Sequence, residues 1–348
     1  MKKNIALVMG GYSGEHDVSI ASGSQVYGQL DHQKYNVYRI VIERQGWYWL
    51  CGDERREVNR ADFTVTDDGR KVVFDLAFVI VHGNPGENGV LQGYFDMLGV
   101  RYTTCGFYTS SLTFHKGFCN PVVASFGLAK VARSVLLFSP DEAGKVPEDM
   151  RYPLFVKPAT GGSSVATTKV KSSEGLAAAI AEAFTEAAEV LVEEGIAGRE
   201  FDCGVMRLPR GTSGLGAAPG GDTPRLGLEE HGKLVFPVTE IIPIGGHEFF
   251  DYEAKYEGFS REVAPAEADD EVVSLIQHTS SRLYDLLGCR GIVRFDYIYN
   301  TDERELYFLE VNTIPGQSAE SIVPKQARAM GLEPATLYEL AIEAALEA

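Results

Sequence analysis

The sequence predicts an α/β protein whose first third forms a parallel sheet. Its 348 residues exceed one ordinary domain, and a hydrophobic share of 45% with 37 glycines indicates a globular chain rich in turns. In the first third, short apolar runs alternate with helical patterns, which is typical of a parallel layer. We expect strands at 4–9, 37–42 and 76–81, helices at 19–30 and 89–98, and a short edge hairpin at 47–50.

The remaining two thirds continue the α/β pattern with less regular spacing. We expect helices at 108–126, 173–188 and 270–287, strands at 154–157, 190–193, 201–208, 292–299 and 306–312, and a helical tail. Residues 209–232 are rich in Gly, Pro, Thr and Ser, so they predict a surface insertion, to which we assign no chemistry.

Charge and cysteine usage exclude several classes of protein. The 49 acidic and 32 basic residues give a net charge of −17, which repels nucleic acids and anionic membranes. No apolar run approaches the roughly 20 residues that span a bilayer. The five cysteines include no CxxC pair, so they indicate neither a disulfide framework nor a zinc site. We expect a soluble, cytoplasmic protein without nucleic acid or membrane partners.

Four polar side chains on two neighbouring predicted strands form the most informative pattern. Arg294 and Asp296 lie two residues apart on one strand, as do Glu310 and Asn312 on the next, so each pair points to one face. A buried ion pair with Arg294 would neutralise only one of the two carboxylates. Carboxylate and amide oxygens on rigid strands suit Mg²⁺, so the pattern favours a metal site over a purely structural salt bridge.

A glycine- and serine-rich loop follows a predicted strand that ends in Lys157. The loop reads Pro-Ala-Thr-Gly-Gly-Ser-Ser-Val, and its backbone N–H and hydroxyl groups can surround phosphate oxygens. Its spacing differs from GxxxxGK[ST], so it implies no Walker-type NTPase. Such a loop alone is more often a turn, but Lys157 and the downstream metal candidates favour phosphate binding.

Two strand–loop–helix junctions lie in the first third of the chain. Residues 10–16 lack the GxGxxG spacing of a dinucleotide-binding loop. Glu15 in this loop suits either an amine ligand or the cap of the following helix, and local sequence leaves both open. His82 opens the second loop, and alone it is best interpreted as a structural histidine. The carboxyl ends of such strands gather at one edge, where open α/β sheets bind ligands.

Taken together, these segments resemble the motifs of D-alanine–D-alanine ligases. The matching segments, in family order over nearly the whole chain, are 10–19, 82–87, 157–158 with 162–165, 252–256, 294–296 and 309–316. The resemblance implies a three-domain ATP-grasp fold. It has an N-terminal parallel-sheet domain at 1–104, a central subdomain at 105–194, and a C-terminal subdomain at 195–348 that carries the metal site.

The resemblance also implies an activity, which is the ATP-dependent joining of two D-alanines through an acyl phosphate for peptidoglycan synthesis. ATP would be a co-substrate with two Mg²⁺ or Mn²⁺ ions, and the enzyme would be a homodimer. A D-alanine–D-lactate or D-alanine–D-serine ligase is the nearest alternative, and a nucleotide-binding regulator without turnover is another. Tyr256 favours the dipeptide enzyme, because its hydroxyl can join a network with Ser163 and Glu15.

The resemblance assigns a role to individual residues. The expected catalytic residues are Glu15, Ser163, Tyr256, Arg294, Gly316 and Ser321. The expected substrate-binding residues are Glu15, His82 and Ser321. The expected ATP-binding residues are Lys116, Lys157, Ser163, Glu193, Ile196, Glu200 and Lys255. The expected metal ligands are Asp296, Glu310 and Asn312. Two positions depart from the family pattern: His115 precedes Lys116 where many members have Asp, and Glu194 stands where a lysine often approaches the adenine.

Overall fold

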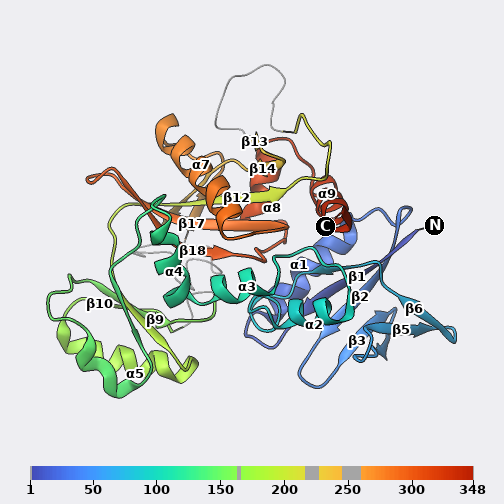
Figure 1. The fold of residues 1–348 in the computed structure, drawn as a ribbon, viewed down its shortest axis with the longest axis horizontal. Coiled ribbons are helices and arrows are strands. Elements are labelled where there is room, and N and C mark those ends of the chain that lie inside the picture. The colour runs from blue at the N-terminus through green and yellow to red at the C-terminus, as the bar shows by residue number, and fades with distance from the viewer. Residues whose placement is uncertain (1, 163–165, 216–226, 245–259, 348) are drawn as a thin grey trace.

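A computed structural model describes residues 2–162, 166–215, 227–244 and 260–347 of the chain. Within them lie a five-stranded, a four-stranded and a seven-stranded sheet, and a separate two-stranded hairpin formed by β5 (Thr64–Asp67) and β6 (Arg70–Val73). The three larger sheets belong to the N-terminal, central and C-terminal parts of the sequence (Figure 1). In the described residues, no helix combines the length and the apolar character needed to cross a membrane.

The N-terminal sheet is parallel at its centre and antiparallel at one edge. Its strands, in spatial order, are β4 (Glu54–Glu57), β3 (Trp47–Cys51), β2 (Tyr35–Ile42), β1 (Lys3–Gly10) and β7 (Leu76–Val79). β1 pairs in parallel with β2 and β7, which confirms the expected parallel layer, and β3 with β4 forms the antiparallel edge hairpin expected at 47–50, so the sheet as a whole is mixed. The short link between β2 and β3 permits a hairpin but no parallel crossover. Helices α1 (His16–Gln29) and α2 (Val90–Leu98) follow β1 and β7.

The helix predicted at 108–126 is two helices, α3 (Phe107–Phe114) and α4 (Lys116–Ser125). They are separated at His115, whose backbone is extended, with φ −102° and ψ 96°. The break has a cause in the loop after β9, because the Lys116 N–H donates to the carbonyl of Ala159 at 2.8 Å and His115 forms a bridge with Thr160. Lys116 is therefore the first residue of α4 and lies beside that loop.

The central sheet is antiparallel throughout its described strands. In spatial order they are β10 (Thr168–Val170), β9 (Leu154–Pro158), β11 (Val190–Glu194) and β8 (Ser134–Leu137). Helix α5 (Leu176–Glu186) packs on this sheet through Ala179, Ile180 and Ala183, and a 3-10 turn, η2 (Ser173–Gly175), precedes it. The predicted helix at 173–188 thus begins later and ends earlier than expected.

The C-terminal sheet has β12 at its centre. Its strands are β12 (Arg199–Arg207), β13 (Leu228–Glu230), β14 (Lys233–Val235), β15 (Thr239–Pro243), β16 (Ser260–Val263), β17 (Ile292–Asn300) and β18 (Glu305–Asn312). One edge of β12 pairs with β17, and the other pairs first with β15 and then with β14. Part of the predicted insertion is therefore ordered, because β13 lies within 209–232; residues 216–226 lie outside the described part.

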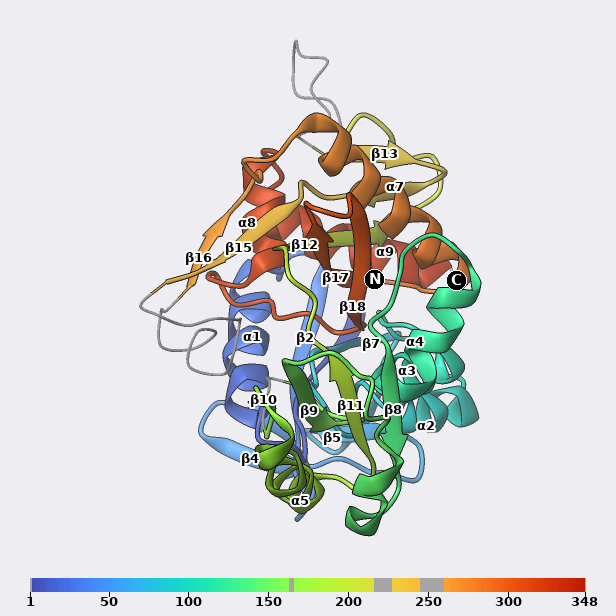
Figure 2. The same cartoon turned by 90° about the vertical axis from the view of Figure 1, so that its left-hand side faces the viewer.

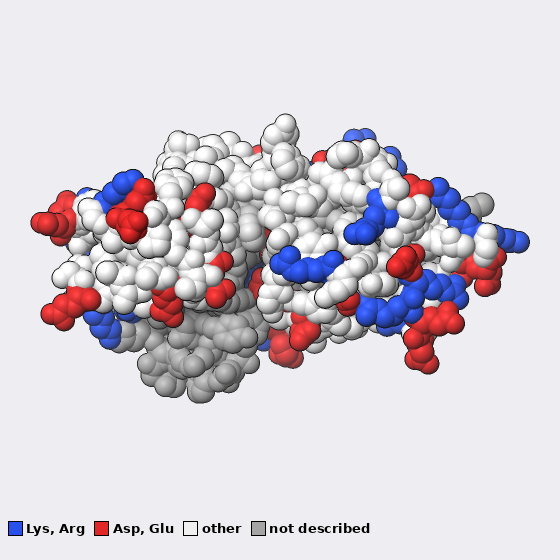
Figure 3. All heavy atoms as spheres, turned by 90° about the horizontal axis from the view of Figure 1, so that it is seen from below, with Lys and Arg blue, Asp and Glu red and all other residues white. Residues whose placement is uncertain are grey.

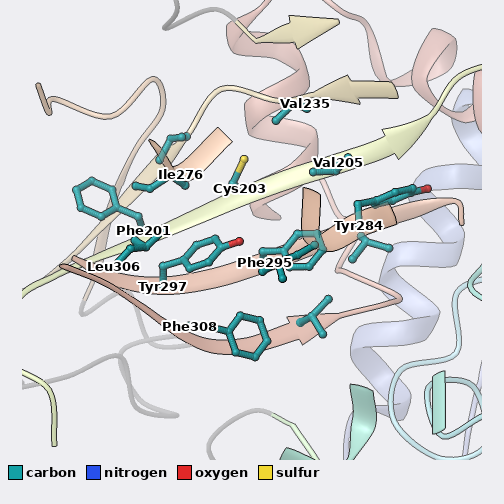
Figure 4. Packing of buried hydrophobic residues seen from close by; sticks show 14 of the residues in the cluster. Phe201, Cys203, Val205, Val235, Ile276, Tyr284, Phe295, Tyr297, Leu306 and Phe308 are labelled. Carbon is teal, nitrogen blue, oxygen red and sulfur yellow. The ribbon is translucent and has the colours of Figure 1, made fainter. Parts of the chain in front are cut away.

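Helix α7 (Asp270–Leu286) covers one face of this sheet, as predicted at 270–287. Its side chains Ile276 and Tyr284 pack against Phe201 of β12 and against Phe295 and Tyr297 of β17 (Figure 4). Alternation of these apolar residues with polar ones along β12 and β17 directs the polar ones to the opposite face. Helix α7 thus fixes which face of the strand pair is buried and which face can bind a ligand.

The N-terminal and C-terminal sheets share an apolar core, whereas the central sheet has its own. Helix α9 (Pro334–Glu347) contacts α1 and β7 on one side and β12 on the other, and helix α8 (Ile322–Ala329) joins the same cluster (Figure 2). The cluster of the central sheet consists of residues from 135 to 192. The C-terminal sheet therefore shares an apolar core with the N-terminal sheet but not with the central sheet.

Candidate active site

A cleft of about 1410 Å³ opens between the three sheets, and Figure 3 shows a hollow between the two halves of the molecule. The predicted site residues that line it are Glu15, Lys116, Lys157, Glu193, Ile196, Glu200, Asp296 and Glu310. Five other predicted site residues are not part of this lining: His82, Arg294, Asn312, Gly316 and Ser321. Ser163, Lys255 and Tyr256 lie outside the described residues.

The four polar residues of β17 and β18 share one face, as the two-residue spacing predicts. Arg294 lies opposite Asn312 and Asp296 opposite Glu310, with a register shift only after Asp296. Arg294 donates to Asp296 through Nε to Oδ1 and through Nη2 to Oδ2, both at 2.7 Å. Nδ2 of Asn312 donates to Oδ2 of Asp296 at 2.9 Å, and Nζ of Lys116 lies 3.1 Å from Oε2 of Glu310. Each carboxylate therefore faces a cation.

Burial and charge act in opposite directions on these cations. Burial lowers the pKa of Arg294, but Asp296 and Asp202 outweigh it and hold that pKa well above its usual range. Burial also lowers the pKa of Lys116, and Glu310 more than offsets this, so the net shift is upward. Both side chains therefore stay charged, and they compensate the carboxylates of Asp296 and Glu310.

The donor set fits a magnesium ion that is shared with a substrate. In the part of the chain that the structure describes, no three His, Cys, Asp or Glu side chains are arranged to hold a metal. Asp296 and Glu310 with the amide of Asn312 would supply only part of a coordination shell, and Mg²⁺ characteristically completes it with water and phosphate oxygens. The arrangement suits a metal that arrives with a nucleotide better than a permanent structural ion.

Asp202 of β12 belongs to this cluster, although sequence reasoning missed it. It lies opposite Asp296 in the strand register, and its Oδ2 is 3.4 Å from Nε of Arg294. Burial raises the pKa of Asp202 well above its usual range, and the charge of Asp296 raises it further. A signal was present, because Glu200 and Asp202 are spaced two apart like the pairs on β17 and β18.

Two lysines reach the cleft from the described part of the central unit. Lys116, at the start of α4, donates from Nζ to the carbonyl of Gly161 at 2.8 Å. Lys157 of β9 forms an ion pair with Glu193 of β11. His115 also lines the cleft, and its Nε2 lies 2.5 Å from Oε2 of Glu189. Lys116 thus contacts the glycine-rich loop at Gly161, and Lys157 lies in the strand that precedes the loop.

Glu194 is neutralised by arginines beside the cleft. Its carboxylate accepts from the backbone N–H of Arg151 at 3.1 Å and from Nε of the same residue at 3.0 Å. Nη1 of Arg133 lies 3.8 Å from it, and the Glu194 side chain is only 4% exposed. The departure from the family's lysine therefore adds no uncompensated negative charge to the lining of the cleft.

Glu15 begins α1 without capping it. It occupies the N-cap position, but its side chain makes no hydrogen bond to the helix N-terminus. A Cβ added at Gly83 would lie 3.2 Å from its Oε2, and one added at Gly162 would lie 3.1 Å from its Oε1. The carboxylate thus lies between two glycine loops at the cleft, which favours the amine-binding interpretation over the capping one.

His82 is buried, and both ring nitrogens face protein groups. Nδ1 lies 2.9 Å from the carbonyl of Ile314, and Nε2 lies 3.4 Å from Oγ of Ser22. Burial lowers the pKa of His82, and the charge of Glu15 only partly opposes this. A neutral ring that donates from Nδ1 satisfies this geometry, so the structure supports a positioning role for His82 beside Glu15.

Gly316 and Ser321 lie together at the start of α8. A Cβ at Gly316 would come within 2.7 Å of Oγ of Ser321, so a side chain at this position would displace that hydroxyl. Oγ of Ser321 also accepts from the N–H of Ser318 at 3.1 Å. The loop after β18 therefore brings a backbone N–H and a hydroxyl to the N-terminal end of α8.

Comparison with known proteins identifies the family. The N-terminal family "D-ala D-ala ligase N-terminus" matches residues 4–105, and "D-ala D-ala ligase C-terminus" matches 123–214 and 226–343. A D-alanine–D-alanine ligase of Parabacteroides distasonis is 40% identical over 336 residues, which cover 96% of this chain and 94% of that protein. The VanG D-Ala:D-Ser ligase from Enterococcus faecalis superposes with a TM-score of 0.83 at 31% identity, over 99% of this chain and 100% of that one. D-alanyl-alanine synthetase A from Vibrio cholerae gives 0.82 at 26% identity, over 100% and 99%.

Proposed function

Since this chain belongs to the D-alanine–D-alanine ligase family, we propose that it joins two D-alanines into D-alanyl-D-alanine with cleavage of ATP. The observation that carries this proposal is the strand pair β17–β18, which directs two carboxylates, an amide and Arg294 to one face at the cleft. Glu15 lies at the same cleft, on the N-terminal side. The dipeptide would serve as a precursor of peptidoglycan.

The first half-reaction activates a carboxylate. Glu15 would bind the ammonium group of the first D-alanine, which directs its carboxylate toward the γ-phosphate of ATP. Lys116, Lys157 and Lys255 would hold the phosphates, while Glu193, the backbone of Ile196 and Glu200 would bind adenine and ribose. The carboxylate oxygen attacks phosphorus, ADP leaves, and an acyl phosphate forms. The protein contributes mainly positioning and charge stabilisation.

The second half-reaction forms the amide bond. Ser321 would bind the carboxylate of the second D-alanine, whose free amine attacks the carbonyl carbon of the acyl phosphate. Arg294 and the N–H of Gly316 would stabilise the negative charge that develops on the carbonyl oxygen. Phosphate then leaves with the bonding electron pair, and the amine loses its proton. Ser163 and Tyr256 would join Glu15 in closing the site.

Asp296, Glu310 and Asn312 would hold magnesium in this scheme, with manganese as a substitute and two ions in all. When bound, the metal neutralises charge on the β- and γ-phosphates. Lys116 and Arg294 form ion pairs with the same carboxylates. Magnesium binding would therefore weaken these internal ion pairs.

A D-alanine–D-serine ligase is the second candidate, because the VanG enzyme that superposes on this chain carries that name. The two reactions share every step up to the acyl phosphate and differ only in the acceptor. We favour D-alanine as acceptor because the D-alanine–D-alanine ligase of Parabacteroides distasonis has the higher identity, 40% against 31%.

Phosphate release with D-alanine alone tests the proposal. The purified protein should release phosphate and form D-alanyl-D-alanine, which mass spectrometry identifies, and D-serine or D-lactate should compete poorly as acceptors. Asp296→Asn should abolish both signals. Release that requires D-serine would support the second candidate, and no release with any acceptor would refute ligase activity.

We also propose a homodimer in the cytoplasm, with domains at 1–104, 105–194 and 195–348. Light scattering of the purified protein tests the dimer, and limited proteolysis tests the boundaries. A monomer, or cleavage only inside these ranges, would contradict the respective proposal.

A further inference from the structure

Ile314 attaches the loop of Gly316 to the N-terminal sheet. It follows β18 by two residues, yet it is 3% exposed and belongs to the apolar cluster of that sheet, which also contains Val81 and Leu91. Its carbonyl accepts from Nδ1 of His82 at 2.9 Å, and its N–H donates to Oε1 of Glu87 at 3.3 Å. The side chain and both backbone groups of Ile314 are therefore held by residues of the N-terminal unit.

Glu87 connects this attachment to the loop beside Glu15. Its second oxygen, Oε2, accepts from the N–H of Gly83 at 2.7 Å. Gly83 in turn lies against the carboxylate of Glu15. One carboxyl group thus bridges two backbone N–H groups, one on the loop that faces the proposed first substrate and one on the loop that carries Gly316.

A second contact holds the other side of Gly316. The N–H of Gln317 donates to Oγ of Ser22 on α1 at 3.2 Å, and that hydroxyl lies 3.4 Å from Nε2 of His82. The backbone on both sides of Gly316 therefore bonds to side chains of the N-terminal unit. Because Ile314 and Gln317 are both held in this way, the N–H of Gly316 between them has a fixed direction.

An acid at position 87 is not the most stable choice for its surroundings. Burial raises the pKa of Glu87 to about 8, and the charge of Glu15 contributes to this shift. Burying an ionised carboxylate costs free energy, yet this one accepts from two buried N–H groups on different loops. This combination favours a functional role for Glu87 over a role in packing alone.

We propose that Glu87 is a positioning residue that sets the N–H of Gly316 for catalysis by bridging Gly83 and Ile314. This inference rests on the proposed function, because it assumes that the Gly316 N–H stabilises the carbonyl oxygen during amide formation. Oxyanion donors act only when they are preorganised, so a small displacement of this loop affects turnover more than binding.

Glu87→Gln tests the bridge with little change in volume. The assay is run at about pH 9, above the pKa of Glu87, so that its carboxylate is ionised and accepts both bonds. The Gln amide has one acceptor oxygen, which the shorter bond from Gly83 will retain. Its NH₂ group then faces the N–H of Ile314, and that hydrogen bond is lost. We expect kcat to fall by about tenfold to a hundredfold with an unchanged KM for ATP. Asp96→Asn is the matched control: Asp96 accepts from Tyr102 at 2.8 Å in the same unit, and its loss should leave kcat unchanged.

Hydrogen exchange supplies a readout that does not depend on activity. In the ligand-free Glu87→Gln protein, the peptide covering 313–320 should exchange faster, while a peptide from α5 should be unchanged. Unchanged kcat together with unchanged exchange would overturn the inference. A lower melting temperature with normal kcat would also overturn it, by assigning Glu87 a purely structural role. A wild-type protein without ligase activity would instead refute the proposed function, and the exchange experiment would still test the bridge.

Discussion

Replacing Arg294 with methionine should destabilise the protein as well as inactivate it. The guanidinium forms ion pairs with Asp296 and Asp202, whose side chains are 8% and 2% exposed. Its removal leaves two buried carboxylates without their counter-charge, whereas methionine fills much of the space. Breaking a buried pair by removing one partner costs about 3–5 kcal/mol, and we expect a loss of unfolding free energy in this range at neutral pH.

The pH dependence of this loss gives a sharper test. Burial and the charge of Asp296 already hold the pKa of Asp202 above its unfolded value, and Arg294 opposes this shift. Without Arg294 that pKa rises further, so the stabilising contribution of Asp202 is present at acidic pH and lost as the pH rises. The deficit of Arg294→Met should therefore shrink toward about pH 4, where carboxyl groups protonate, and be largest at neutral pH. Urea unfolding across this range measures it. The additional change Asp296→Asn removes one of the two charges and should restore part of the stability.

The same variant should lose about a hundredfold to a thousandfold in kcat, the usual cost of removing an oxyanion donor. An unfolding free energy equal to that of the wild type at neutral pH, or a deficit of constant size across the pH range, would refute the assigned charge balance. If the variant is inactive but as stable as the wild type, Arg294 is needed for catalysis but not for neutralising Asp296 and Asp202.

Three further substitutions test separate parts of the site. Glu15→Gln should raise the KM for the first D-alanine far more than the KM for ATP, because it removes the counter-charge of the ammonium group; equal increases in steady-state kinetics would show that the amine assignment is wrong. Lys255→Ala should slow phosphoryl transfer in single-turnover experiments more than it weakens Mg²⁺ binding, and unchanged turnover would remove Lys255 from the site. Glu194→Gln should raise the KM for ATP with little change in kcat, because Arg151 and Arg133 lose their shared partner next to the cleft. A decrease in kcat at constant KM would contradict that interpretation.

The ligand face of β17 and β18 could be predicted from spacing alone. Polar residues two apart on adjacent strands must share a face, and the short turn after Asn300 makes the strands antiparallel neighbours. The register shift after Asp296 could not be foreseen, but it leaves Arg294 and Asn312 paired. Local periodicity was sufficient here because both strands belong to one hairpin.

Contacts between distant segments could not be predicted in this way. The break at His115 depends on Ala159, and the neutralisation of Glu194 depends on Arg151, which local patterns do not connect. The role of Glu87 depends on Ile314, more than two hundred positions away. The antiparallel edge of the N-terminal sheet was within reach of local sequence, because the edge hairpin expected at 47–50 is present as β3, paired antiparallel with β2 and β4.

The N-terminal and C-terminal sheets share an apolar core, whereas the central sheet has a separate one, and this difference determines which sheet can move. Separating the N-terminal and C-terminal sheets would expose the side chains that α9 buries against both, including Phe78 and Tyr338, whose ring centroids lie 6.0 Å apart. Among the described residues, the cluster under α5 contains none from either neighbouring sheet, so rotating the central sheet outward would leave it intact. We therefore expect the cleft to open for a nucleotide by a movement of the central sheet against the other two.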